Sequence, residues 1–189
     1  KTGKIPKFSD TGINEFKTEN GRTVYDGGGV LPDVEIKTST RTEATKKLLS
    51  SKAIFDFATD YFYQNSQIAI AENYELTPGD FKNFTKFLET DTTFVTAQES
   101  LFKKAYISAE NKNISKEYEK IKEKLFEDKI SEISKNQDII NYLLEEEILE
   151  KYYYKEGVYK HHLKRDKTIF EAVKLLKNQE KYKQILLGK

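Results

Sequence analysis

Cysteine, methionine and tryptophan are absent from the 189-residue chain, and proline occurs only three times. Without cysteine, neither a disulfide nor a thiolate metal site can form, and a chain of this length can bury a core without such links. No apolar run approaches the ~18 residues that a membrane-spanning helix needs, so the sequence predicts no transmembrane segment. No signal peptide opens the chain, and its first residue is lysine rather than methionine, so we expect a piece of a longer protein.

An excess of either charge is also missing. Lysine and arginine number 32 and aspartate and glutamate 31, for a formal net charge of +1. Proteins that neutralise many phosphates carry a marked basic excess, so this balance argues against nucleic acid as the main partner. The 12 tyrosines and 12 phenylalanines separate the chain from disordered sequences, which have few aromatic residues. We therefore expect a folded domain that binds no nucleic acid.

Turn-forming residues are concentrated at the N-terminus, where residues 1–37 hold six of the nine glycines. The segments Asn14–Thr18 and Arg22–Asp26 flank Asn20-Gly21, a pair that tolerates positive φ and is the strongest short signal for a β-hairpin. Val30–Ile36 follows, with an extended residue expected before its proline and two apolar residues on one face. The sequence predicts a hairpin and then a short strand.

The rest of the chain, residues 38–189, carries apolar residues at helical spacing. The predicted fold class is therefore mainly α: an N-terminal β-hairpin and short strand, followed by an irregular multi-helix domain with one or two long charged helices. Thr77-Pro78 has the N-cap and first-turn residues of a helix start, and Gly157 is expected to break a helix. The predicted helices are 42–64 (in two pieces around Ser50-Ser51), one from 77, 96–109, 114–133, 139–152 (separate from or continuous with the one before), 158–164, 168–176 and 181–187.

Two short patterns resemble phosphate-binding or catalytic motifs but lack the required context. Gly27–Gly29 has neither of the glycine spacings that cradle phosphates, and a predicted strand follows it instead of a helix. We expect these glycines to allow a close backbone crossing. Ser100 and Lys103 match SxxK, and Lys1–Gly3 spells KTG, but KTG should follow SxxK and the SDN element is missing. We expect Ser100 to face solvent.

Four further clusters could carry a function. His161 and His162 are adjacent, so on a helix they point about 100° apart and rarely bind one metal; we expect one to be packed and one exposed. Tyr152–Tyr154 spans too wide an arc for one helix face, so we expect it to be shared between the core and an interface. We expect the charged clusters to be solvated helix faces: Glu145–Glu147 with Glu150, and Lys160, Lys164, Arg165 and Lys167.

The segment Asn14–Ile36 reads NEFKTENGRTVYDGGGVLPDVEI. It resembles the end of the protease core in C-terminal-processing (tail-specific) serine peptidases of the Bacteroides and Flavobacterium type, where a stretch like FKTxNGRxVYDGGGIxPD follows the catalytic elements. The matching residues are Phe16–Thr18, Asn20–Arg22, Val24–Gly29 and Pro32-Asp33. Downstream, Ala53–Ala58, Glu145–Ile148 and Tyr152–Gly157 resemble the helical extension of that subgroup.

The resemblance implies a serine nucleophile and a lysine general base in the parent enzyme. In the family the serine sits in a GSAS-like element and the lysine in an FGKG-like element, and a PDZ domain takes up the C-terminus of the substrate. None of these elements occurs in this chain. We therefore predict no catalytic, cofactor-binding or metal-binding residue, and we expect the chain to be inactive alone.

The resulting hypothesis has two regions: residues 1–37 end a protease core, and residues 38–189 form a C-terminal helical domain. The resemblance implies as partners the missing protease core and PDZ domain, protein substrates and further copies of the chain, in the periplasm or at the cell envelope. The helical domain would stabilise the core, build an oligomer or help admit substrate. The alternative is a free-standing helical adaptor that binds other proteins. Nucleic-acid binding through Lys160–Lys167 is a third hypothesis, which the charge balance disfavours.

Overall fold

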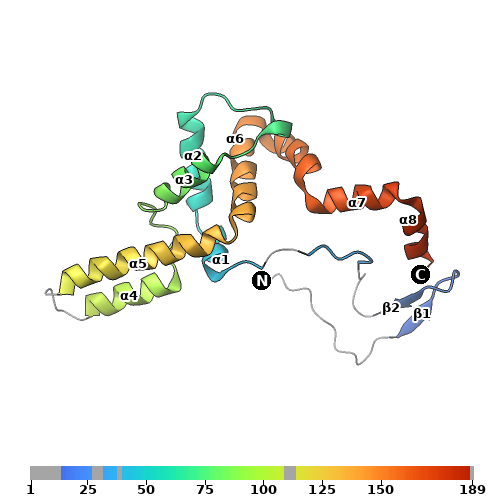
Figure 1. The fold of residues 1–189 in the computed structure, drawn as a ribbon, viewed down its shortest axis with the longest axis horizontal. Helices are drawn as coiled ribbons and strands as arrows, with labels where there is room; N and C mark the ends of the chain where they lie inside the picture. The colour runs from blue at the N-terminus through green and yellow to red at the C-terminus, as the bar shows by residue number, and fades with distance from the viewer. Residues whose placement is uncertain (1–13, 27–31, 38–39, 109–113, 188–189) are drawn as a thin grey trace. The chain divides into compact units, whose positions relative to one another are not determined.

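The computed structural model describes residues 14–26, 32–37, 40–108 and 114–187, and helices dominate it (Figure 1). The mainly α prediction is confirmed. Contacts divide the chain into two compact units, residues 39–164 and a second unit that takes in 1–38 and 165–189. The predicted domain boundary after residue 37 stays a prediction. The elements are β1 (Glu15–Lys17), β2 (Thr23–Tyr25), α1 (Glu43–Leu49), α2 (Ala53–Gln64), the 3-10 helix η1 (Ala71–Asn73), α3 (Pro78–Phe87), α4 (Ala97–Ser108), α5 (Ser115–Ser134), α6 (Gln137–Arg165), α7 (Lys167–Lys177) and α8 (Gln179–Leu186).

The predicted N-terminal hairpin is present. Strands β1 and β2 pair antiparallel, with Phe16 opposite Val24 in the middle of the register. The turn between them has Gly21 at φ 78°, a conformation that glycine adopts without a Cβ penalty. At the open end, Asp26 accepts hydrogen bonds from the backbone and side-chain N–H groups of Asn14, at 2.7 and 2.9 Å. All six strand residues are exposed, so neither face of the hairpin contributes a buried residue.

The short strand predicted over residues 30–36 is not formed in its described part. Residues 32–37 adopt bends and irregular backbone. A β-strand needs a neighbouring backbone to pair with, and the described residues offer none to this segment. An exposed ion pair between Arg22 and Asp33 connects the segment to the hairpin. Val30 and Leu31 lie outside the described residues, as do Gly27–Gly29 and Lys1–Gly3.

Local signals set the ends of the first helices of the 39–164 unit, and two of them, at Ser50-Ser51 and Thr77-Pro78, were predicted. The break at Ser50-Ser51 is confirmed, because both serine hydroxyls donate to carbonyls in the last turn of α1 and end it. Helix α3 begins with a capping box in which Thr77 and Asp80 satisfy each other's backbone N–H groups, and Pro78 takes the first turn. Helix α4 begins similarly, because Glu99 accepts the backbone N–H of Thr96 at 2.7 Å.

Helices α5 and α6 are separate, which settles the alternative that the sequence leaves open. Asn136 stands between them and is buried. Its Oδ1 accepts hydrogen bonds from the Thr42 backbone N–H and the Thr45 hydroxyl, at 2.9 and 3.0 Å, and its Nδ2 donates to the Thr40 carbonyl. This side chain completes the start of α1, more than 90 residues away in sequence, and so ties the turn between α5 and α6 to it.

The helix break predicted at Gly157 lies instead at Tyr154, where φ is 56° and ψ is −166°. Both arms of α6, before and after Tyr154, are helical, and the segments predicted separately as 139–152 and 158–164 are these two arms. Gly157 has a different role: a Cβ there would lie 2.2 Å from the Cβ of Tyr153, so only glycine allows the second arm to come this close.

One hydrophobic core lies within the 39–164 unit, where α1, α2, α3 and α5 meet the two arms of α6 (Figure 1). Full burial of a large apolar side chain contributes about 1.5–3 kcal/mol, so these residues supply most of the stability of the unit. The core residues are Leu48, Ala53, Phe57, Ala58, Ala71, Tyr74, Leu76, Phe81, Phe84, Leu88, Phe94, Ile133, Ile140, Leu144, Ile148, Leu149 and Val158. Helices α4, α7 and α8 have no buried residue.

Candidate functional site

The two arms of α6 meet through a buried glutamate and histidine. Glu145 lies on the first arm and His161 on the second, and the chain reversal at Tyr154 brings Glu145 Oε2 to 3.1 Å from His161 Nε2. Both side chains are almost completely inaccessible to solvent, at 4% and 0% exposure. A buried carboxylate is costly unless it is paired and hydrogen-bonded, so the position of each residue depends on the other.

The same two side chains also bind the segment before α3. Glu145 Oε1 accepts the backbone N–H of Leu76 at 2.8 Å, and His161 Nδ1 lies 3.2 Å from the carbonyl oxygen of Ala71. Both ring nitrogens of His161 therefore lie within hydrogen-bond distance of an oxygen atom. Burial closes this network to any substrate. Its chemistry is structural: it joins η1 and the following residues to α6.

A second pair lies beside the first. His162 Nε2 is 2.6 Å from Glu146 Oε1, and the His162 ring stacks on Tyr142 with 5.2 Å between ring centroids. Both side chains are about a quarter exposed. The expectation of one packed histidine holds for His161, whereas His162 is half-buried. The expectation of a solvated acidic face is wrong for Glu145, because the kink that buries it has no sequence signal.

The wide arc of the three consecutive tyrosines predicts that only some of them pack on the core, and the structure confirms this part of the prediction. Tyr152 donates its hydroxyl to the Asn65 carbonyl, and burial raises its pKa above the ordinary value. Tyr153 donates to the Ala69 carbonyl at 3.2 Å, so both rings fix the segment after α2. Tyr154 is exposed. The predicted interface role for this cluster stays a prediction.

The remaining candidates from the sequence do not assemble into a reactive site. Lys160 pairs with Glu156 at 2.7 Å, and Lys164 donates to the Asn73 side chain at 3.3 Å. Ser100 and Lys103 both lie on α4, and no hydrogen bond joins their side chains in the described part of the chain. Ser100 is half-buried rather than facing solvent freely.

Sequence reasoning missed a buried lysine. Lys129, on the charged helix α5, is almost inaccessible and donates to Glu99 Oε1 at 2.7 Å and to the Phe94 carbonyl at 3.1 Å. Its ammonium also lies over the Phe94 ring, 4.6 Å from the centroid. The contact fixes the base of the α4–α5 pair to the core. The Thr96–Glu99 capping spacing was visible in the sequence, but nothing distinguished Lys129 from its solvated neighbours.

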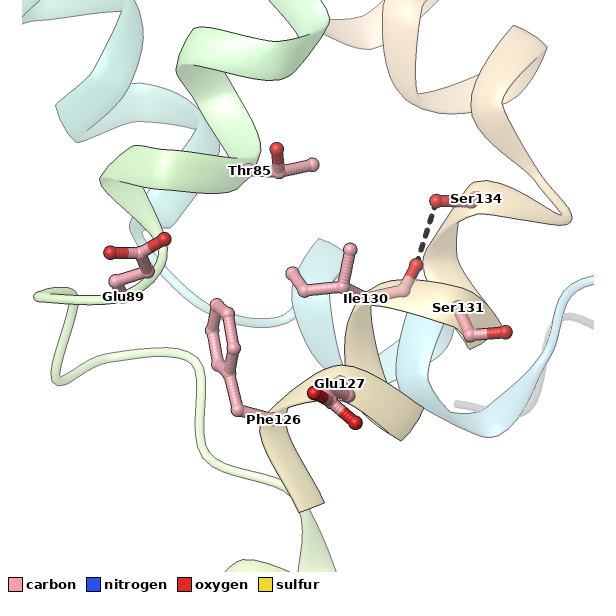
Figure 2. Close-up of a pocket in the computed structure, with 7 residues that line it drawn as sticks. All are labelled: Thr85, Glu89, Phe126, Glu127, Ile130, Ser131 and Ser134. Carbon is pink, nitrogen blue, oxygen red and sulfur yellow. Dashed lines mark hydrogen bonds between the residues drawn. The ribbon is translucent and has the colours of Figure 1, made fainter. Parts of the chain in front are cut away.

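An open groove of about 420 Å³ lies between α3 and α5 (Figure 2). The Phe126 and Ile130 side chains form its apolar part, and Glu89 and Glu127 supply carboxylates. The Ser134 hydroxyl already donates to the Ile130 carbonyl, at 2.8 Å. The groove offers a packing surface rather than reactive groups. Its lining residues are Thr85, Glu89, Phe126, Glu127, Ile130, Ser131 and Ser134.

The described residues offer neither a metal site nor a membrane-spanning helix. They contain no group of three or more histidine, cysteine, aspartate or glutamate residues placed to hold a metal ion. Among their helices, none combines the length and apolar character needed to cross a membrane.

Comparison with protein families identifies the helical part of the chain. The family model described as "Probable PDZ-protease, C-terminal helical domain" matches residues 44–176, which is more than half of the chain. The chain belongs to this family. Searches of curated proteins and of solved structures gave no match.

The PDZ-protease match runs from the second residue of α1 almost to the end of α7. It takes in both histidine–glutamate pairs, the buried Lys129 and the groove, and it leaves out the hairpin and α8. Association with a protease, predicted from the sequence, is confirmed at this level. The family implies a protease core as a partner domain in the parent protein. The match, which is to a helical domain, is consistent with a non-catalytic region.

Proposed function

We propose that this chain is the non-catalytic C-terminal region of a C-terminal-processing serine peptidase, whose serine and lysine lie in another part of the parent and cleave protein substrates. One observation carries the proposal. A segment that resembles the end of that protease core, residues 14–36, directly precedes a helical domain of the PDZ-protease family in a single chain. The resemblance also supports the Bacteroides and Flavobacterium subgroup and a periplasmic or cell-envelope location.

The hairpin supports core stabilisation as the main role. A two-stranded hairpin alone is marginally stable in water, and this one leaves Phe16, Val24 and Tyr25 exposed. An exposed, unpaired strand edge is a template for pairing with another sheet. In the parent, the hairpin would extend the sheet of the protease core and attach the helical domain to it.

The experiment has two arms. Incubating this chain alone with a C-terminally tagged protein substrate should give no turnover; cleavage would overturn the proposal. In the full-length parent, Phe16→Ser with Tyr25→Ser should lower both the melting temperature of the core and its turnover. The control is Leu101→Ser with Ile107→Ser, two apolar residues on α4 that are also exposed, which should change neither.

The free-standing adaptor is the second candidate, and one observation favours it: the 39–164 unit has its own buried core. Limited proteolysis of the isolated chain separates the two functions. Rapid loss of residues 1–37 with an intact helical unit supports the protease-core origin of that segment. Protection of residues 1–37 to the same extent as the helical unit supports the adaptor.

A further inference from the structure

Helices α7 and α8 carry several large apolar side chains that are exposed. Neither helix has a buried residue. Phe170, Val173 and Leu176 recur at helical spacing along α7, so they share a face. The exposed fractions are Phe170 66%, Val173 43%, Leu176 55%, Leu186 48% and Leu187 43%. Such a concentration of exposed apolar surface on one short pair of helices indicates a site of interaction.

The charge of this helix pair departs from that of the whole chain. Residues 167–187 carry five lysines and only two glutamates, although the chain as a whole is balanced at +1. Helix α5 is the natural comparison: it has five lysines and six acidic residues, and its lysines form ion pairs at i+3 and i+4, such as Lys124 with Glu127 and Asp128. A basic excess that the helices do not neutralise themselves favours an anionic counterpart.

We propose that α7 and α8 bind the surface of an anionic phospholipid membrane, with their apolar face in the headgroup region and their lysines beside lipid phosphates. Helices that combine phenylalanine and leucine with lysine bind membrane interfaces in this way. Lys174 and Lys177 follow Phe170 by four and seven residues, so they flank the apolar side chains, and a lysine stem can lie along apolar surface while its ammonium reaches the phosphates. Each lysine near an anionic surface adds to the attraction, and salt screens it. The inference goes beyond the proposed function and does not depend on it, because it requires no protease core.

Another protein is the competing occupant of this face, and the charge distribution disfavours it. Helix α5, whose apolar stripe packs against protein within the chain, carries acidic and basic residues in nearly equal number. A helix pair that packs only against protein has no need for a net excess of lysine. An anionic lipid surface accounts for the apolar face and the lysine excess together.

The absence of tryptophan allows a direct measurement on the whole chain. Phe170→Trp introduces the only indole on the proposed membrane face, and Leu101→Trp introduces it at a position on α4 that is equally exposed, at 66%. Each variant is mixed with vesicles of phosphatidylglycerol or of phosphatidylcholine. We expect the fluorescence of Phe170→Trp to shift to the blue with phosphatidylglycerol only, and that of Leu101→Trp to stay unchanged with both lipids.

Matched charge and apolar variants test the two halves of the proposal by vesicle co-sedimentation. Lys174→Glu with Lys177→Glu should weaken binding to phosphatidylglycerol vesicles about tenfold or more. The control, Lys103→Glu with Lys104→Glu on α4, makes the same change in net charge and should bind like the unmodified chain. Phe170→Ser with Leu176→Ser should also lose binding, whereas Leu101→Ser with Ile107→Ser should keep it.

Several outcomes would overturn the inference. These are equal binding to neutral and anionic vesicles, no binding to either, and equal losses in the α4 controls. A blue shift of Phe170→Trp that grows with protein concentration in the absence of lipid would instead assign the face to protein association. Because every substituted side chain is exposed, the helical circular dichroism of all variants should match that of the unmodified chain, so a loss of binding reports the surface itself.

Discussion

The 39–164 unit and the elements outside it, β1, β2, α7 and α8, treat their apolar residues in opposite ways. The unit buries apolar side chains from four helices around the two arms of α6. The outer elements have helices and strands of good local geometry, with caps and a glycine turn, yet contribute no residue to the core. Regular secondary structure therefore does not by itself imply a buried apolar face, because the outer elements are regular and their apolar side chains are largely exposed.

Ionisable groups follow the same division. The 39–164 unit places ionisable side chains in its interior, as in Glu145 with His161 and Lys129 with Glu99. The outer elements pair theirs in solvent, as in Lys174 with Glu171. Exposed pairs contribute about 0–1 kcal/mol, whereas breaking a buried pair costs several times more. Substitutions at the buried pairs of the 39–164 unit should therefore lower the free energy of unfolding more than substitutions at exposed pairs.

The largest effect is expected for Glu145→Ala. It leaves the buried His161 ring and the Leu76 N–H without their acceptor, and removal of one partner of a buried pair costs about 3–5 kcal/mol. Urea unfolding followed by circular dichroism measures the loss. The neighbouring Glu146→Ala is the control and should cost about 1 kcal/mol or less, because its pair with His162 is partly solvated. Equal effects would show that the two pairs are equivalent.

Lys129→Ala should be next in size. The substitution leaves Glu99 and the Phe94 carbonyl without the ammonium, but Glu99 is one-fifth exposed, so we expect a cost of about 2–3 kcal/mol. Hydrogen exchange should show faster opening of α4 than of α6, because Lys129 fixes the base of the α4–α5 pair. The control Lys124→Ala removes two exposed ion pairs and should cost less than about 0.5 kcal/mol.

Tyr154→Gly should stabilise the unit. Tyr154 has φ 56° and ψ −166°, a region that is nearly restricted to glycine and costs other residues about 1–3 kcal/mol. Its exposed ring gives little in return, so we expect a gain of about 1 kcal/mol in the free energy of unfolding. Tyr154→Ala keeps the Cβ and should give no such gain. Stabilisation by both variants would instead implicate the aromatic ring.

The sequence predicted the elements whose signals are local. The hairpin at Asn20-Gly21, the break at Ser50-Ser51 and the start of α3 at Thr77-Pro78 all depend on residues within one turn of the feature. The mainly α class was predicted from the helical spacing of apolar residues, a signal that lies within each single helix. The protease association came from a recognised segment, not from any physical property of it.

The features that the sequence did not predict depend on distant residues. The helix break was predicted at Gly157 because glycine is a poor helix former. In the structure, glycine is required at this position because a Cβ there would clash with the Tyr153 side chain. Glu145 and Lys129 sit in runs of charge that are typical of solvated faces. Only the reversal at Tyr154 and the packing of α5 on the core place them inside, and neither has a local signature.

The smallest predicted effect concerns the hairpin and tests whether the Asn14–Asp26 hydrogen bonds stabilise its paired strands. Hydrogen bonds from Asn14 hold the pKa of Asp26 below its ordinary value, so the ionised carboxylate favours the paired hairpin. That contribution is complete above the unfolded pKa, near 4, and is lost as the pH falls through the lower folded value. Cross-strand contacts between Phe16 and Val24, followed by NMR, should therefore weaken at the acid end. Asp26→Asn should remove this dependence and Glu15→Gln should not; persistence of the dependence in Asp26→Asn would assign it to another carboxylate.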